Sequence, residues 1–150
     1  MNAYDICQRN VVTVRGHEDL ATATWVMRER NVGCLVVVEP LAGPGGWRPV
    51  GMLSDRDIVT KVIAQERDPR GVAAADVMSP AVSIIKQSRI EDAVQRMKQV
   101  GTRRLAVVDE RGRLSGILTF DDIFEYLTRK AAPAAAPLRL QPGRMGTDRI

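Results

Sequence analysis

The fold is decided by the stretch from Arg104 to Ile123, which reads RLAVVDERGRLSGILTFDDI. Leu105 to Val108 is an apolar run with the length of a buried strand. The polar break that follows ends at Gly112, which is typical of a tight hairpin turn. A second apolar run, Leu114 to Leu118, leads into an amphipathic segment that begins at Thr119. The stretch therefore predicts a strand, a tight turn, a second strand and a helix.

Thr119 and Asp122 stand where the second strand meets the helix. A hydroxyl at the N-cap and an acid three residues later can bond to free N–H groups of the first helical turn. Taken alone, this pattern indicates helix capping. It occurs twice, however, because GMLSDRDI at Gly51–Ile58 matches GILTFDDI at Gly116–Ile123. The repetition suggests that the two pairs also serve a common function.

Composition places the chain among soluble globular proteins. Its 150 residues are 45% hydrophobic and 27% charged, which is ordinary for such a protein. No apolar run approaches the roughly 20 residues that a membrane helix needs. The first residues, MNAYD, do not form a secretory signal. We therefore expect a cytoplasmic protein with no membrane partner.

Few residues are suited to metal or nucleic-acid binding. The two cysteines, Cys7 and Cys34, predict no disulfide framework, and with the single His17 they form no metal-ligand cluster. The net charge of +4 suits contact with anions such as phosphates. The charge is too dispersed, and aromatic residues are too few, to indicate nucleic-acid binding.

The whole chain repeats, with the element order β-α-β-β-α in each copy, so the fold class is α/β, of the α+β type. Val12–Val14 corresponds to Val82–Ile84. The first hairpin loop, expected over Glu39–Trp47, is five residues longer than the second. Gly33 and Gly101 are expected to end the first helix of each copy, and Ser88–Glu91 to begin the second of these helices as a capping box.

The expected boundaries are residues 1–68 for the first repeat, 69–75 for a linker, 76–130 for the second repeat and 131–150 for a disordered tail rich in Ala and Pro. One copy alone would be marginally stable because it is so small. We therefore expect the two copies to share a core, with pseudo-twofold symmetry and two equivalent clefts between them.

Several motifs recur in order: the lead-in Asp76–Pro80, the segment Val82–Ile84 and the strand Arg104–Asp109. Each copy ends with the same pattern, which is Gly, two apolar residues, Ser or Thr, any two residues and then Asp. Together these motifs resemble a stand-alone pair of CBS domains, the Bateman module, over about residues 4–128. The resemblance implies adenosine-containing ligands bound in the clefts between the repeats, and a homodimer. It implies no required cofactor.

The resemblance also implies roles for particular residues. Asp57 and Asp122 would accept hydrogen bonds from the ribose 2′ and 3′ hydroxyls, because charged acceptors form the stronger hydrogen bonds. Ser54 and Thr119 would orient these carboxylates, backbone and apolar groups of two strand segments would contact the base, and arginines would contact phosphates. The expected ligand-binding residues are Thr13, Val14, Ser54, Arg56, Asp57, Ser83, Ile84, Arg103, Arg104, Thr119 and Asp122.

The two sites are expected to differ. The first copy has Gly33 and Cys34 where the second has the two arginines, and Arg56 is either a substitute cation or a surface charge. The cleft of Asp122, Thr119 and Arg104 is therefore the expected site for a phosphorylated nucleotide. The chain also departs from the family pattern, since Val36 and Ala106 stand where Pro is frequent, and Cys7 and Gln8 stand where the second lead-in has Met78 and Ser79.

Three functions are compared. The first is a regulatory module that senses AMP, ADP, ATP or S-adenosylmethionine and signals to an unknown protein. The alternative is a ligand-free structural dimerisation module, in which Trp25, whose counterpart is Gln95, would face a partner subunit. No enzyme is expected, because His17 lacks a nucleophile pattern and the adjacent Asp121 and Asp122 do not converge on one substrate.

Overall fold

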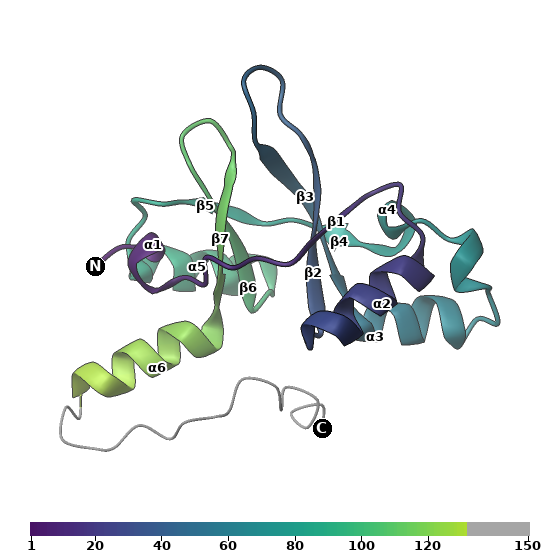
Figure 1. Cartoon of the computed structure of the whole chain (residues 1–150). Helices are drawn as coiled ribbons and strands as arrows, with labels where there is room; N and C mark the ends of the chain where they lie inside the picture. The colour runs from purple at the N-terminus through teal and green to yellow at the C-terminus, as the bar shows by residue number, and fades with distance from the viewer. Residues whose placement is uncertain (132–150) are drawn as a thin grey trace. The chain divides into compact units, whose positions relative to one another are not determined.

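The computed structural model describes residues 1–131 and divides them into two compact units (Figure 1). The first-repeat unit is Val12–Ala81. The second-repeat unit combines Met1–Val11 with the described chain from Val82 onward. The tail expected over 131–150 lies outside the described residues, except for Ala131, which ends a helix. Among residues 1–131, no helix has both the length and the apolar character needed to cross a membrane.

The first-repeat unit is built on a four-stranded sheet in the order β1-β2-β3-β4. β1 runs parallel to β2, and the other pairings are antiparallel. The helices α2 and α3 lie side by side (Figure 1) and contact strands β2 and β3. The elements are β1 (Thr13–Arg15), α2 (Leu20–Arg30), β2 (Cys34–Pro40), β3 (Trp47–Ser54), α3 (Asp55–Ile58), the π-helix η1 (Val59–Ile63), the 3-10 helix η2 (Pro69–Gly71), α4 (Ala74–Val77) and β4 (Ser79–Pro80).

The second-repeat unit has a three-stranded sheet in the order β5-β6-β7. β5 is parallel to β6, and β6 is antiparallel to β7, as in the first repeat. The elements are α1 (Ala3–Ile6), β5 (Ser83–Ile85), α5 (Ile90–Val100), β6 (Arg104–Val108), β7 (Leu114–Thr119) and α6 (Phe120–Ala131). The predicted β-α-β-β-α order is confirmed in both copies.

Each unit has its own hydrophobic core, made of aliphatic residues because aromatic residues are scarce. Leu35 pairs with Leu53 across β2 and β3, and Leu105 pairs with Leu118 across β6 and β7. All four leucines are completely buried. The same apolar pattern in the two copies therefore builds the same cross-strand core twice.

The compact units do not coincide with the sequence repeats, because each unit contains a short segment that precedes the other repeat in sequence. Ala3, from the start of the chain, is buried in the core of the second-repeat unit. Val72, Ala74 and Val77, which precede the second repeat in sequence, are buried in the core of the first-repeat unit. We call residues 2–8 and 72–80 the lead-in segments. Each lead-in segment completes the core of the repeat that it does not precede.

Three local predictions are wrong. The segment expected to be a loop over Glu39–Trp47 is partly strand, because Glu39 pairs with Arg48 and Pro40 with Trp47 before the chain turns. Asn31, with a φ of 52°, and not Gly33, takes the left-handed position that ends α2.

Gly101, with a φ of 73°, ends α5 as predicted. The capping box expected at Ser88–Glu91 does not form. The N-cap of α5 is Arg89, and no side chain caps the helix. The Ser88 carbonyl instead accepts a hydrogen bond from the Ala3 N–H at 2.8 Å, so the lead-in segment packs where the helix begins.

Candidate functional site

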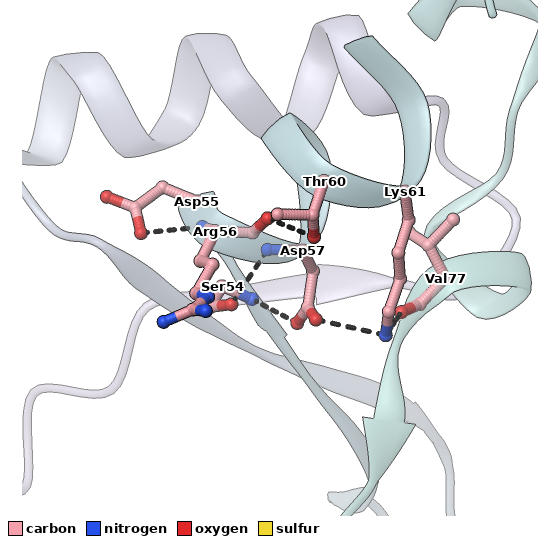
Figure 2. A network of polar contacts seen from close by, with 7 residues as sticks. All are labelled: Ser54, Asp55, Arg56, Asp57, Thr60, Lys61 and Val77. Carbon is pink, nitrogen blue, oxygen red and sulfur yellow. Dashed lines mark hydrogen bonds and ion pairs between the residues drawn. The ribbon is translucent and has the colours of Figure 1, made fainter. Parts of the chain in front are cut away.

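Asp57 and Ser54 form a reciprocal cap where β3 meets α3 (Figure 2). The Ser54 N–H donates to Asp57 Oδ2 at 3.0 Å, and the Asp57 N–H donates to Ser54 Oγ at 3.1 Å. These bonds satisfy two N–H groups that a helix start leaves without intrahelical partners. The predicted capping role of this pair is therefore confirmed, and it uses one of the two carboxylate oxygens.

Asp122 and Thr119 form the equivalent cap where β7 meets α6. The Thr119 N–H donates to Asp122 Oδ2 at 2.8 Å, and the Asp122 N–H donates to Thr119 Oγ1 at 3.1 Å. The Thr119 hydroxyl adds a further bond by donating to Asp122 Oδ2 at 2.7 Å. Both carboxylates are thus held in the same orientation through the same oxygen.

The second oxygen of Asp57 forms an ion pair with Lys61. Lys61 Nζ lies 3.0 Å from Asp57 Oδ1 and also donates to the Val77 carbonyl at 3.0 Å (Figure 2). Burial by itself would raise the pKa of Asp57. The hydrogen bonds from the Ser54 N–H and from Lys61 outweigh burial and lower the pKa below its ordinary value. Asp57 is therefore a well-ionised carboxylate with both oxygens engaged.

The second oxygen of Asp122 has a neutral partner from the lead-in segment. Gln8 Nε2 donates to Asp122 Oδ1 at 3.0 Å. The Gln8 backbone is fixed by two hydrogen bonds to Ile117 of β7, each 2.9 Å long. In both units, therefore, the carboxylate is linked to a lead-in segment, through Gln8 in one case and through Lys61 and Val77 in the other.

A glycine lets each lead-in segment lie close to its strand. A Cβ atom at Gly116 would lie 2.5 Å from Cys7 Sγ and 3.0 Å from the Gln8 carbonyl oxygen. A Cβ atom at Gly51 would overlap Met78 Sδ, and its nearest neighbours would all be side-chain atoms. Burial raises the pKa of the Cys7 thiol, and the positive charge of Arg9 partly offsets this effect. Gly51 and Gly116 thus leave the space that Met78 and Cys7 of the lead-in segments fill.

The residues predicted to contact the base lie on the edge strands β1 and β5. The side chains of Thr13 and Ser83 are exposed, whereas those of Val14 and Ile84 are buried in the cores. A contact from Val14 to a ligand would therefore come from the backbone, whereas Ile84, which is 9% exposed, lines an open depression on the second-repeat unit together with Ser83. β2 separates Thr13 from the Ser54 cap, and β6 separates Ser83 from the Thr119 cap.

The three candidate arginines differ in their contacts. Arg103 forms an ion pair with Asp121 at 3.2 Å and stacks 4.8 Å from the centre of the Phe120 ring. Arg104 lies opposite Thr119 in the strand register, and its side chain forms no ion pair with any described residue. Arg56 is exposed beside the Ser54 cap (Figure 2). Arg103 therefore already has an acidic partner, and Arg104 is the arginine in register with the Thr119 cap.

Each unit has a shallow depression at the other end of its sheet. One, of about 370 Å³, is lined by Ile85, Val108 and their neighbours, and the other, of about 430 Å³, by Arg15, Val38 and their neighbours. Neither depression is lined by Asp57 or Asp122. Within residues 1–131, no group of three or more His, Cys, Asp and Glu side chains is placed to hold a metal ion.

Comparison with a family model matches the CBS domain at residues 3–64 and again at 74–129. An uncharacterised protein of Methanopyrus kandleri is 34% identical over 81% of this chain, and the match covers only 60% of that protein's length. Hypoxic response protein 1 of Mycobacterium tuberculosis is 35% identical, over 86% of this chain and 87% of that protein.

Solved structures of known proteins also match this chain. The crystal structure of Hypoxic Response Protein I, which has two coordinated zinc ions, is 35% identical with a TM-score of 0.68 and covers 83% of this chain and 97% of that one. The hexameric CBS-CP12 protein of bloom-forming cyanobacteria is 29% identical, with a TM-score of 0.72 and coverage of 90% and 76%. CBSX2 in complex with AMP is 25% identical, with a TM-score of 0.68 and coverage of 87% and 98%.

Proposed function

This chain belongs to the CBS domain family, with two copies of the domain in tandem, and on that basis we propose that it is a regulatory module that binds an adenosine-containing ligand. The observation that carries the proposal is the matched pair of carboxylates, Asp57 and Asp122, each held by a cap at the end of a strand. The complex of the related CBSX2 with AMP supports the choice of an adenine nucleotide.

In this proposal, the ribose hydroxyls donate to Oδ1 of each carboxylate, the oxygen that the capping N–H does not contact and that we call the outward oxygen. Oδ2 is already occupied by the backbone N–H of Ser54 or Thr119. Arg104, which lies in register with Thr119 and has no ion-pair partner among the described residues, contacts a phosphate at the Asp122 site. The ligand is AMP, ADP, ATP or S-adenosylmethionine, and its binding changes the affinity of the module for a regulated protein.

Thermal unfolding with a panel of these four ligands tests the proposal. A ligand at 100 times its dissociation constant stabilises the folded state by about 2.7 kcal/mol. Asp57→Asn and Asp122→Asn keep the shape of the side chain but remove the charge that makes it a strong acceptor. We expect one ligand to raise the melting temperature by several degrees and one or both variants to reduce that rise. Absence of a shift with all four ligands would contradict the proposal.

Assembly into a dimer is a second candidate function, favoured by an exposed apolar face on α6. Phe120, Phe124 and Leu127 recur at helical spacing and are all exposed, Phe124 by 60%. Trp25 on α2 is also exposed, by 61%. Sedimentation of the full chain with and without Phe124→Ser tests this function. A monomer at micromolar concentration in the absence of the substitution would contradict it.

A further inference from the structure

The two carboxylates differ in the group that occupies their outward oxygen. At Asp57 this group is the Lys61 ammonium, 3.0 Å away, and at Asp122 it is the neutral amide of Gln8, also 3.0 Å away. The position equivalent to Lys61 in the second repeat is Tyr126, which carries no positive charge at neutral pH. The two sites therefore differ in the charge beside the carboxylate, although the rest of the repeat matches.

Lys61 is held on two sides. It forms the ion pair with Asp57 and donates to the carbonyl of Val77, the last residue of α4 (Figure 2). The Asp57 side chain is only 18% exposed and that of Lys61 is 43% exposed, so solvent screens this pair less than an ion pair on the open surface. The same contact contributes to the lowered pKa of Asp57. Lys61 is therefore a fixed partner of the carboxylate in the free protein.

We propose that Lys61 is a positioning residue that keeps the outward oxygen of Asp57 occupied, so that uncharged hydroxyl ligands bind more weakly at Asp57 than at Asp122. This inference rests on the proposed function, because it assumes that a pair of ribose hydroxyls binds at Asp57. Asp57 Oδ2 accepts from the Ser54 N–H, so hydroxyls that bind at Oδ1 share that oxygen with the Lys61 ammonium, whose positive charge makes Oδ1 a poorer acceptor. At Asp122 the competitor is a neutral amide, which makes the weaker bond to a carboxylate.

Adenosine is the appropriate probe, because it carries the hydroxyl pair and no phosphate. Calorimetric titration of Asp122→Asn would measure the Asp57 site, and titration of Asp57→Asn would measure the Asp122 site. Adding Lys61→Met to Asp122→Asn removes the competing charge and keeps much of the aliphatic stem. We expect adenosine to bind about fivefold more tightly in that variant, the effect of removing an ion pair of this kind. Asp57 remains ionised at neutral pH in the variant, because the ordinary pKa of Asp is about 3.9.

A matched control is Lys98→Met, which removes the same charge from an exposed position on α5. It should leave adenosine binding unchanged. Lys61→Arg keeps the positive charge and should restore the weaker binding.

Salt gives a further readout that a merely structural role would not change. Raising NaCl from about 0.05 to 0.5 M should tighten adenosine binding at Asp57, because salt screens the competing ion pair, and should leave binding at Asp122 unchanged.

The outcomes separate this inference from the proposed function. Unchanged or weaker binding in Lys61→Met, together with loss of binding on adding Asp57→Asn, would overturn the role of Lys61 and leave Asp57 as a binding group. No binding of adenosine at Asp57 in any variant, including Lys61→Met, would overturn the role of Lys61 and remove Asp57 from the proposed function. Loss of binding at Asp122 as well would overturn the proposed function itself. Tighter binding in Lys61→Met, reversed by Lys61→Arg and absent in Lys98→Met, would support the inference.

Discussion

Replacement of Gly116 by Ala should dislodge the lead-in segment from β7. The new Cβ would lie 2.5 Å from Cys7 Sγ and 3.0 Å from the Gln8 carbonyl oxygen, so both a side chain and the backbone must move. Overpacking of this kind costs about 1 to 3 kcal/mol. Loss of the two backbone hydrogen bonds between Gln8 and Ile117 would add about 1 kcal/mol for each bond. We therefore expect Gly116→Ala to reduce the free energy of unfolding by about 3 to 5 kcal/mol.

Urea denaturation followed by far-UV circular dichroism measures this loss. Gly71→Ala is the matched control, because a Cβ at Gly71 meets no atom within 4 Å. Cys7→Ala removes the sulfur that the new methyl group would strike, so the double variant should recover part of the stability lost in Gly116→Ala. An effect of Gly116→Ala no larger than that of Gly71→Ala, or no recovery in the double variant, would refute the steric argument.

Three further predictions concern the helix ends. Asp57, with its lowered pKa, stabilises the folded state above its unfolded pKa of about 4, and this contribution is lost as pH falls through the folded pKa. Asp57→Asn should therefore lose less stability than the parent protein in an acid titration below about pH 4 monitored by circular dichroism. Thr119→Ala should lower the free energy of unfolding, measured by urea denaturation, by about 1 kcal/mol, since it removes the cap of α6. Thr119→Ser keeps the capping hydroxyl and should leave the free energy of unfolding unchanged. Asn31→Ala should lower the melting temperature, because Asn31 has a φ of 52°, a backbone conformation that Ala adopts only with strain.

The parts of the site that could be predicted are those made by local chemistry. Ser54 and Thr119 lie three residues from their carboxylates, and the capping pattern follows from that spacing. Lys61 was missed, although it lies four residues after Asp57 on the same helical face, a spacing at which opposite charges meet.

Other parts of the site depend on contacts that leave no local pattern. Gln8 and Asp122 are separated by 114 residues, so nothing near either residue indicates their hydrogen bond. The glycines at 51 and 116 carried a partial signal, because glycine within a strand marks close approach of another backbone. The incoming segment could not be named, since its identity follows from the tertiary structure.

The fold itself was more predictable, because hydrophobic periodicity repeats in both copies and sets the strand and helix order. The errors occurred where a neighbouring segment overrides local preference. Ser88 has the sequence of a helix cap, but its carbonyl bonds to Ala3 and the helix begins one residue later. The strand pairing of Pro40 with Trp47 likewise extends a hairpin through residues that are typical of loops.

The exchanged lead-in segments impose an order on folding during synthesis. Every element of the unit Val12–Ala81 is contiguous in sequence, so this unit can complete its core as soon as Ala81 has left the ribosome. Residues 1–11 emerge earlier, but the strand and core that receive Ala3 and Gln8 lie beyond Val82. Residues 1–11 are therefore made before the elements that receive them, and until β7 appears Cys7 and its neighbours remain without the contacts that bury them.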